Sequence, residues 1–127
     1  MTGDKRTARE RAHDLVAQMT LAEKCAQMKY DAPAIPRLGV PAYNWWNEAL
    51  HGVARSGAAT VFPQAIGLAA TFDVDGVKGT AAAISDEMRA KYNQYRTFGE
   101  TQIYQGITAW SPNINIFRDP RWGRGHE

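Results

Sequence analysis

The sequence is poor in the features that mark several common protein classes. Its single cysteine, Cys25, excludes a disulfide within the chain and is typical of a reducing compartment. The net charge is only +2, which gives no support to general binding of nucleic acid or of a membrane surface. No apolar run approaches membrane-spanning length, and the charged first 15 residues contain no apolar segment of a signal peptide. We therefore expect a cytoplasmic protein without nucleic-acid or membrane partners.

Two helices are predicted near the start of the sequence. Apolar residues recur at helical spacing between residues 8 and 19, opposite a charged face. The motif "TLAEK" then restarts a helix, because Thr20 can cap it and Glu23 can close a capping box. We expect the apolar stripe of this second helix, which includes Cys25, to face inward, so that Cys25 serves packing.

Two strands follow, separated by further helices. The segment "PAYNWW", residues 41–46, is predicted as a strand, and "ITAW", residues 107–110, as another. Between them, a short helix opens at Pro63, a longer one begins at Asp73, and residues 93–106 form a polar connection. A strand, a helical crossover and a strand imply parallel pairing and the α/β class. Two parallel strands leave unpaired edges, so we expect residues 1–127 to be the first part of a larger fold.

Polar side chains gather after both predicted strands. "NEALHG" places Asn47, Glu48 and His51 after the first, and residues 113–127 place asparagines, arginines, Asp119 and Glu127 after the second. Because the carboxyl ends of parallel strands meet at one edge, we expect both clusters on the same rim. Tryptophan faces beside carboxylates, amides and arginines suit a sugar, whose C–H face stacks on indole while its hydroxyls pair with donors and acceptors. The pattern therefore favours a carbohydrate site.

Each candidate also has a structural interpretation. Trp45 and Trp46 are adjacent, so only one can face a site from a strand, and either can belong to the core. Glu48 can interact with the dipole of a helix formed by "EALHG", and His51 can be a structural histidine. The charged residues of the last segment also have local alternatives: an ion pair between Arg118 and Asp119 that shapes the loop, and a solvated Arg121. Spacing alone leaves both interpretations open.

Four long segments, in this order, resemble a known family. "YNWWNEALHGV", "FPQAIGLAATFD", "ISDEMRAKYN" and "WSPNINIFRDPRWGRGHE" are similar to the N-terminal barrel domain of glycoside hydrolase family 3, and above all to its β-xylosidase branch. The similarity extends from about Ala12 to Glu127. It implies the N-terminal part of a TIM-like (β/α)8 barrel, completed by a continuation of the chain or by a second chain, with neither a metal nor a cofactor.

The resemblance also implies an activity. Enzymes of the family are retaining exo-glycosidases, so we expect removal of terminal non-reducing β-D-xylosyl or β-D-glucosyl residues from oligosaccharides or aryl glycosides. The aspartate nucleophile and glutamate acid/base of the family lie on segments absent from these 127 residues. The resemblance therefore argues against Glu48 and Glu127 as a catalytic pair and implies that residues 1–127 alone are inactive. The alternative is a non-catalytic carbohydrate-binding fragment or module.

The resemblance assigns binding roles to four residues and supporting roles to three. Glu48 and Arg124 match positions that bind sugar hydroxyls, Trp46 belongs to the aromatic element beside them, and His51 lies in the adjoining turn. The supporting residues are Arg118 and Asp119, which hold the loop, and Glu127, which supports Arg124. Because Glu48 is one methylene longer than the aspartate common in β-glucosidases, it favours a pentose by occupying the space of a glucose hydroxymethyl group.

Overall fold

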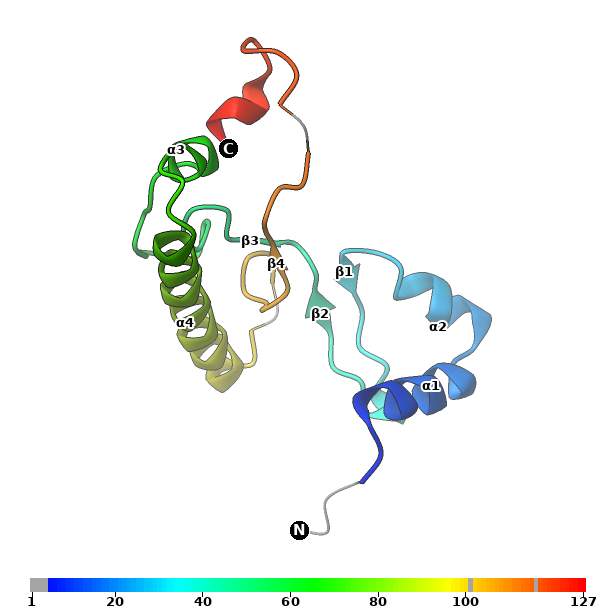
Figure 1. Cartoon of the computed structure of the whole chain (residues 1–127). Coiled ribbons are helices and arrows are strands. Elements are labelled where there is room, and N and C mark those ends of the chain that lie inside the picture. Colours follow the sequence, from blue (N-terminus) through cyan, green and yellow to red (C-terminus); the bar gives the residue numbers. More distant parts are fainter. Residues whose placement is uncertain (1–4, 101, 116) are drawn as a thin grey trace. The chain divides into compact units, whose positions relative to one another are not determined.

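The computed structural model describes residues 5–100, 102–115 and 117–127, and Figure 1 shows its ribbon. The chain divides into two compact units, Met1–Tyr43 and Asn44–Glu127. All of the candidate site residues belong to the second unit. Among the described residues, no helix combines the length and the apolar character that crossing a bilayer requires.

The first unit contains two capped helices followed by a short turn structure. Its elements are α1 (Ala8–Gln18), α2 (Leu21–Ala26), β1 (Asp31–Ala32), η1 (Pro36–Leu38) and β2 (Tyr43–Asn44), which extends one residue into the second unit. Each α-helix begins with a capping box, formed by Thr7 with Glu10 and by Thr20 with Glu23. The prediction of both helices and of the Thr20 cap is confirmed. β1 pairs with β2 in a two-stranded sheet.

The predicted inward face of α2 is wrong. Cys25 is exposed, as are Leu21 at 77% and Met28 at 87%. The buried apolar residues of this unit are Ala32 in β1 and Ile35 just before η1. Its small core therefore forms at the turn rather than under the helix, and Cys25 does not serve packing.

An arginine joins α2 to the turn. The side chain of Arg37 donates through Nε to Oε1 of Glu23 over 2.9 Å, and through Nη2 to the carbonyl of Gln18 over 2.9 Å. Its Nη2 also donates to Oε2 of Glu23, which completes a two-pronged contact. These bonds from Arg37, with a backbone bond from Thr20, lower the pKa of Glu23 to about 2.

The second unit is a strand–helix–helix–strand arrangement. Its elements are β3 (Asn47–Glu48), α3 (Ala65–Ala70), α4 (Val74–Phe98), β4 (Ala109–Trp110) and η2 (Gly123–His126). β3 and β4 pair in parallel, with Asn47 opposite Ala109 and Glu48 opposite Trp110. The predicted parallel pairing and the α/β class are confirmed. Figure 1 shows α4 alongside the β3–β4 pair.

A small core fixes α4 against the segment that follows β3. Ala49, Ile84 and Met88 are buried together, and Val53 and Phe62 pack against them. Ile84 and Met88 lie on the face of the helix that the apolar spacing predicts. This contact orients the segment after β3, from which much of the candidate site is built.

Several predicted boundaries are corrected. "PAYNWW" does not form one strand: Oδ1 of Asn44 accepts the backbone N–H of Trp46 over 2.9 Å, and this side-chain bond ends β2 before β3 begins. Asn47 and Glu48 therefore lie in a strand and not after it, and "EALHG" forms no helix.

α4 continues through the predicted connection to Phe98, where Gly99 at φ 72° ends it. α3 starts later than predicted, after Gln64.

Candidate functional site

A pocket of about 680 Å³ opens beside the carboxyl ends of β3 and β4, and we call it the main pocket. Its volume falls within the range of about 300–1,000 Å³ that is usual for small-molecule sites. Glu48 and Trp110 line it from the strands, Trp46 from just before β3, and Asn113, Arg124 and Glu127 from the last segment. Most of the remaining wall comes from residues 50–61, the pocket loop. The expectation that the two polar clusters share one rim is confirmed for these residues.

Trp46 and Glu48 form one side of the main pocket. They are two residues apart, on either side of Asn47, and both line the main pocket, whereas Trp45 does not. Nε1 of Trp46 donates to Oε1 of Glu48 over 2.9 Å. The ring of Trp46 also packs against that of Trp110, with 6.0 Å between centroids and a tilt of 52°. Trp46 is 37% exposed, so the core interpretation does not hold for it.

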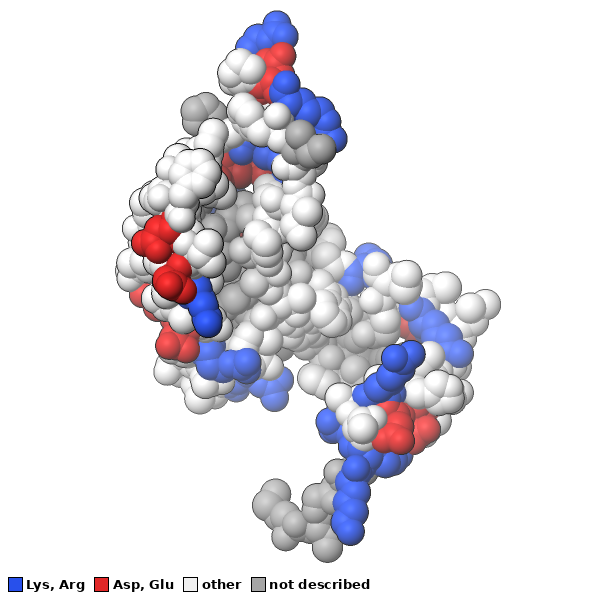
Figure 2. Space-filling view, in the orientation of Figure 1, with Lys and Arg blue, Asp and Glu red and all other residues white. Residues whose placement is uncertain are grey.

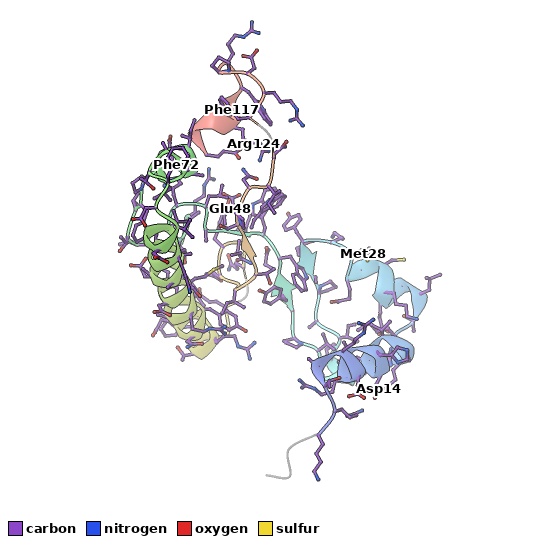
Figure 3. All side chains as sticks on the ribbon, viewed as in Figure 1. Asp14, Met28, Glu48, Phe72, Phe117 and Arg124 are labelled. Atoms are coloured by element: carbon purple, nitrogen blue, oxygen red, sulfur yellow. The ribbon has the colours of Figure 1, made fainter. Side chains whose placement is uncertain are left out.

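Arg124 and Glu127 form another side. Nη1 of Arg124 lies 3.2 Å from Oε2 of Glu127, and the same carboxylate accepts the side-chain amide of Asn113. The guanidinium also lies 5.2 Å from the centroid of the Trp122 ring. Figure 3 shows Glu48 in the centre of the second unit and Arg124 on η2. The Nε atom of Arg124 is buried and has no hydrogen-bond partner in the described chain, so it is a donor in need of an acceptor.

His51 contributes both to the pocket wall and to the shape of the loop. Its Nδ1 lies 2.9 Å from the carbonyl oxygen of Phe62, which can only accept, and Phe62 in turn donates its backbone N–H to the carbonyl of His51 over 2.8 Å. The first bond places the proton of the neutral ring on Nδ1, and Nε2 is then an acceptor. His51 therefore has a structural role in the loop and also lines the main pocket.

The predicted partnership of Arg118 with Asp119 is wrong. Asp119 instead binds Arg121, with Oδ1 accepting from Nε over 2.9 Å and Oδ2 from Nη2 over 2.7 Å, and these bonds lower the pKa of Asp119. Arg118 donates to Oδ1 of Asn115 over 2.9 Å. Arg121 is exposed, as expected, and it is also the ion-pair partner of Asp119. Figure 2 shows the basic and acidic atoms of this segment next to one another.

Two further residues differ from expectation. Asn47 is 1% exposed and does not line the main pocket: its Oδ1 accepts the backbone N–H of Gly106 over 2.7 Å, and its Nδ2 donates to the carbonyl of Asn44 over 3.0 Å. It therefore serves to hold β3. Trp110, predicted only as part of a strand, lines the pocket. Its position at the end of a parallel strand was the signal available for it.

The arrangement supplies binding chemistry. Aromatic faces, carboxylate acceptors and a partly unsatisfied guanidinium line one concave surface, which is the combination that a polyhydroxylated ring requires. Among the described residues, no three histidine, cysteine, aspartate or glutamate side chains lie together in a group that could hold a metal ion.

The family follows from a comparison of sequences. The profile of the glycosyl hydrolase family 3 N-terminal domain matches residues 9–127. The chain belongs to glycosyl hydrolase family 3. The matched range includes every residue that lines the main pocket.

Curated relatives of this family 3 chain carry xylosidase names. It is 47% identical to a xylan 1,4-beta-xylosidase of Xylanibacter ruminicola over 95% of this chain and 14% of that protein. It is 51% identical to the probable beta-D-xylosidase 7 of Arabidopsis thaliana over 93% of this chain and 16% of that protein. It is 52% identical to the probable exo-1,4-beta-xylosidase bxlB of Aspergillus flavus over 92% of this chain and 16% of that protein. The chain thus spans 14% to 16% of the length of these relatives.

Proposed function

We propose that this chain supplies the sugar-binding part of a retaining exo-β-glycosidase that removes terminal β-D-xylosyl residues. It forms the N-terminal portion of a (β/α)8 barrel, and a continuation or a second chain supplies the rest together with the catalytic aspartate and glutamate. The observation that carries the proposal is the convergence of Trp46, Glu48, Arg124 and Glu127 on one pocket at the strand ends. The xylosidase names of the relatives support the choice of sugar.

The contacts of the two glutamates support binding rather than bond cleavage. A retaining mechanism uses two carboxyl groups about 5–5.5 Å apart, one as nucleophile and one as proton donor. Glu48 is engaged by the indole N–H of Trp46, and Glu127 by Arg124 and Asn113. Each carboxylate is thus kept as a hydrogen-bond acceptor, and neither is assigned to catalysis.

The sugar contacts follow from the donors and acceptors that remain. Oε1 of Glu48 accepts the indole N–H, so its other oxygen is available to sugar hydroxyls. Arg124 offers Nε, which lacks a partner in the described chain, to a hydroxyl oxygen. The indole faces of Trp46 and Trp110 offer a surface for the C–H groups of the ring.

The length of Glu48 supports a pentose. Glutamate reaches one methylene further into the pocket than aspartate and takes up space that the hydroxymethyl group of glucose needs. A size difference of one chemical group between two sugars supplies only about 1–3 kcal/mol of discrimination. We therefore also expect a lower activity on glucosides, or on arabinosides, whose sugar is a related pentose.

Hydrolysis of nitrophenyl β-D-xyloside and β-D-glucoside by the complete gene product tests the proposal. We expect preference for the xyloside, release of xylose with its anomeric configuration retained, and no turnover by residues 1–127 alone. A large preference for the glucoside would overturn the xylose assignment, and turnover by residues 1–127 would overturn the placement of the catalytic groups. Sugar binding without hydrolysis would favour a non-catalytic carbohydrate-binding fragment.

A further inference from the structure

One face of α4 makes a row of contacts with the pocket loop. Glu87, Lys91 and Tyr95 are spaced by four residues, so their side chains lie one above another on the same side of the helix. Each of them bonds a residue of the pocket loop, and none of them lines the main pocket. The hydroxyl of Tyr95 lies 2.9 Å from Oγ of Ser56, which is buried.

The two charged members of the row hold the loop by its backbone. The carboxylate of Glu87 accepts the backbone N–H of Thr60 over 3.1 Å at Oε2 and its hydroxyl over 2.5 Å at Oε1. Nζ of Lys91 donates to the carbonyls of Ser56 over 2.7 Å and of Ala58 over 2.6 Å. Bonds to backbone atoms fix the path of the chain itself, and bonds that involve a charged partner are the stronger ones.

The pocket loop needs such support because its backbone path is unusual. Gly52 lies at φ 136° and Gly57 at φ 70°, which glycine adopts readily, whereas Arg55 carries a side chain and is strained at φ 52°. A Cβ at Gly52 would lie 2.4 Å from the carbonyl oxygen of Thr60, so the two ends of the loop approach each other closely. No helix or strand occurs within residues 50–61. Its shape therefore depends on contacts with other parts of the unit.

The loop residues between these contacts form the wall of the main pocket. Gly57, Ala58 and Ala59 line it, and the bonds of Lys91 and Glu87 occur at Ser56, Ala58 and Thr60. A displacement of these backbone atoms moves the wall directly. The hydroxyl and the backbone N–H of Thr60 also lower the pKa of Glu87, because both bonds favour its charged carboxylate.

We propose that Glu87 and Lys91 are positioning residues of the main pocket, which set its affinity for the sugar through the pocket loop without touching the sugar. The inference rests on the proposed function for the identity of the ligand. It gives a role to the motif "ISDEMRAKYN", whose charged residues lie on a helix and outside the pocket.

Kinetics and proteolysis of the complete gene product test this role. In Lys91→Ala we expect the KM for nitrophenyl β-D-xyloside to rise about tenfold or more, with kcat much less affected, because charge-assisted bonds to the loop are lost while the reacting groups stay in place. Lys91→Arg, which keeps a cationic donor, should restore part of the affinity. Trypsin should also cleave faster after Arg55, which lies within the loop. Glu87→Gln, a milder change, should shift KM and cleavage in the same direction.

Lys78→Ala and Asp86→Ala are matched controls, because both residues are exposed on the same helix and do not line the main pocket. They should leave KM and cleavage unchanged. Unchanged KM in Lys91→Ala and Glu87→Gln would overturn the positioning role even if cleavage increased, and unchanged cleavage would show that the residues do not hold the loop. A wild-type protein without xyloside binding or hydrolysis would refute the proposed function, and cleavage after Arg55 would then decide the role in the loop by itself.

Discussion

The indole N–H of Trp46 donates to Oε1 of Glu48 over 2.9 Å, and this bond joins the aromatic surface of the main pocket to its carboxylate. The two side chains share a face because they alternate along the chain with Asn47, which points into the protein and is 1% exposed. The buried bonds of Asn47 therefore also fix which way Trp46 and Glu48 point. A pocket built in this way has its acceptor oriented before a ligand arrives.

Trp46→Phe tests the bond between these two residues. Phenylalanine keeps an aromatic face but has no N–H, so the carboxylate of Glu48 loses the donor that orients it. Bonds to charged groups contribute about 1.5–3 kcal/mol, so we expect at least a tenfold rise in KM for nitrophenyl β-D-xyloside. Trp45→Phe is the control, since Trp45 does not line the main pocket. Equal effects of the two substitutions would contradict the orienting role.

Glu48→Asp tests the origin of sugar selectivity. The shorter side chain keeps the charge and leaves room for a hydroxymethyl group. We expect the ratio of kcat/KM for xyloside to that for glucoside to fall by a factor of about ten, within the 1–3 kcal/mol that one methylene supplies. Parallel kinetics on the two nitrophenyl glycosides measure the ratio. If both rates fall alike and the ratio stays constant, Glu48 binds sugar without selecting it.

Arg124→Lys separates charge from geometry. Lysine keeps the positive charge but lacks Nε and the planar fork, so it cannot both pair with Glu127 and offer the donor that is now buried without a partner. We expect KM to rise about tenfold for xyloside and glucoside alike, because the hydroxyls concerned are common to both sugars. Arg121→Lys changes an exposed ion pair with Asp119 outside the pocket and should have no effect. A loss confined to one sugar would contradict this assignment.

The pairing of β3 with β4 could be predicted from the sequence, whereas the register of β3 could not. A strand followed by helices and a second strand returns in parallel, so order alone was sufficient. That Trp46 rather than Trp45 faces the pocket depends on where β3 begins. This point is set by bonds of Asn44 to Trp46 and Asn47, and short polar residues of this kind compete with regular structure in ways that periodicity does not show.

The bonding partners of charged residues could not be predicted from the sequence either. Arg118 and Asp119 are neighbours in sequence, yet Asp119 pairs with Arg121, because the turn over residues 119–122 brings the side chain of Arg121 back to the carboxylate. Lys91 is separated from Ser56 by 35 residues, and its partners are backbone carbonyls, which no residue pattern marks. The capping box at Thr20, in contrast, is local and was predicted correctly.

The ion pair of Glu23 with Arg37 predicts a pH dependence for the first unit. Arg37 is the main cause that lowers the pKa of Glu23 from its ordinary 4.5 to about 2. The folded carboxyl therefore binds a proton less readily than the unfolded one, and its ionisation stabilises the fold. This stabilisation is complete above about pH 4.5 and is lost as the pH falls toward 2.

Arg37→Gln should raise the pKa of Glu23 toward 4.5, without reaching it, since Thr20 still donates to the carboxylate. An NMR titration of the Glu23 carboxyl carbon measures the shift, and denaturant unfolding from pH 2 to 6 measures the stability. Arg9→Gln, an exposed change on α1, should alter neither, and an unshifted Glu23 in Arg37→Gln would refute the prediction.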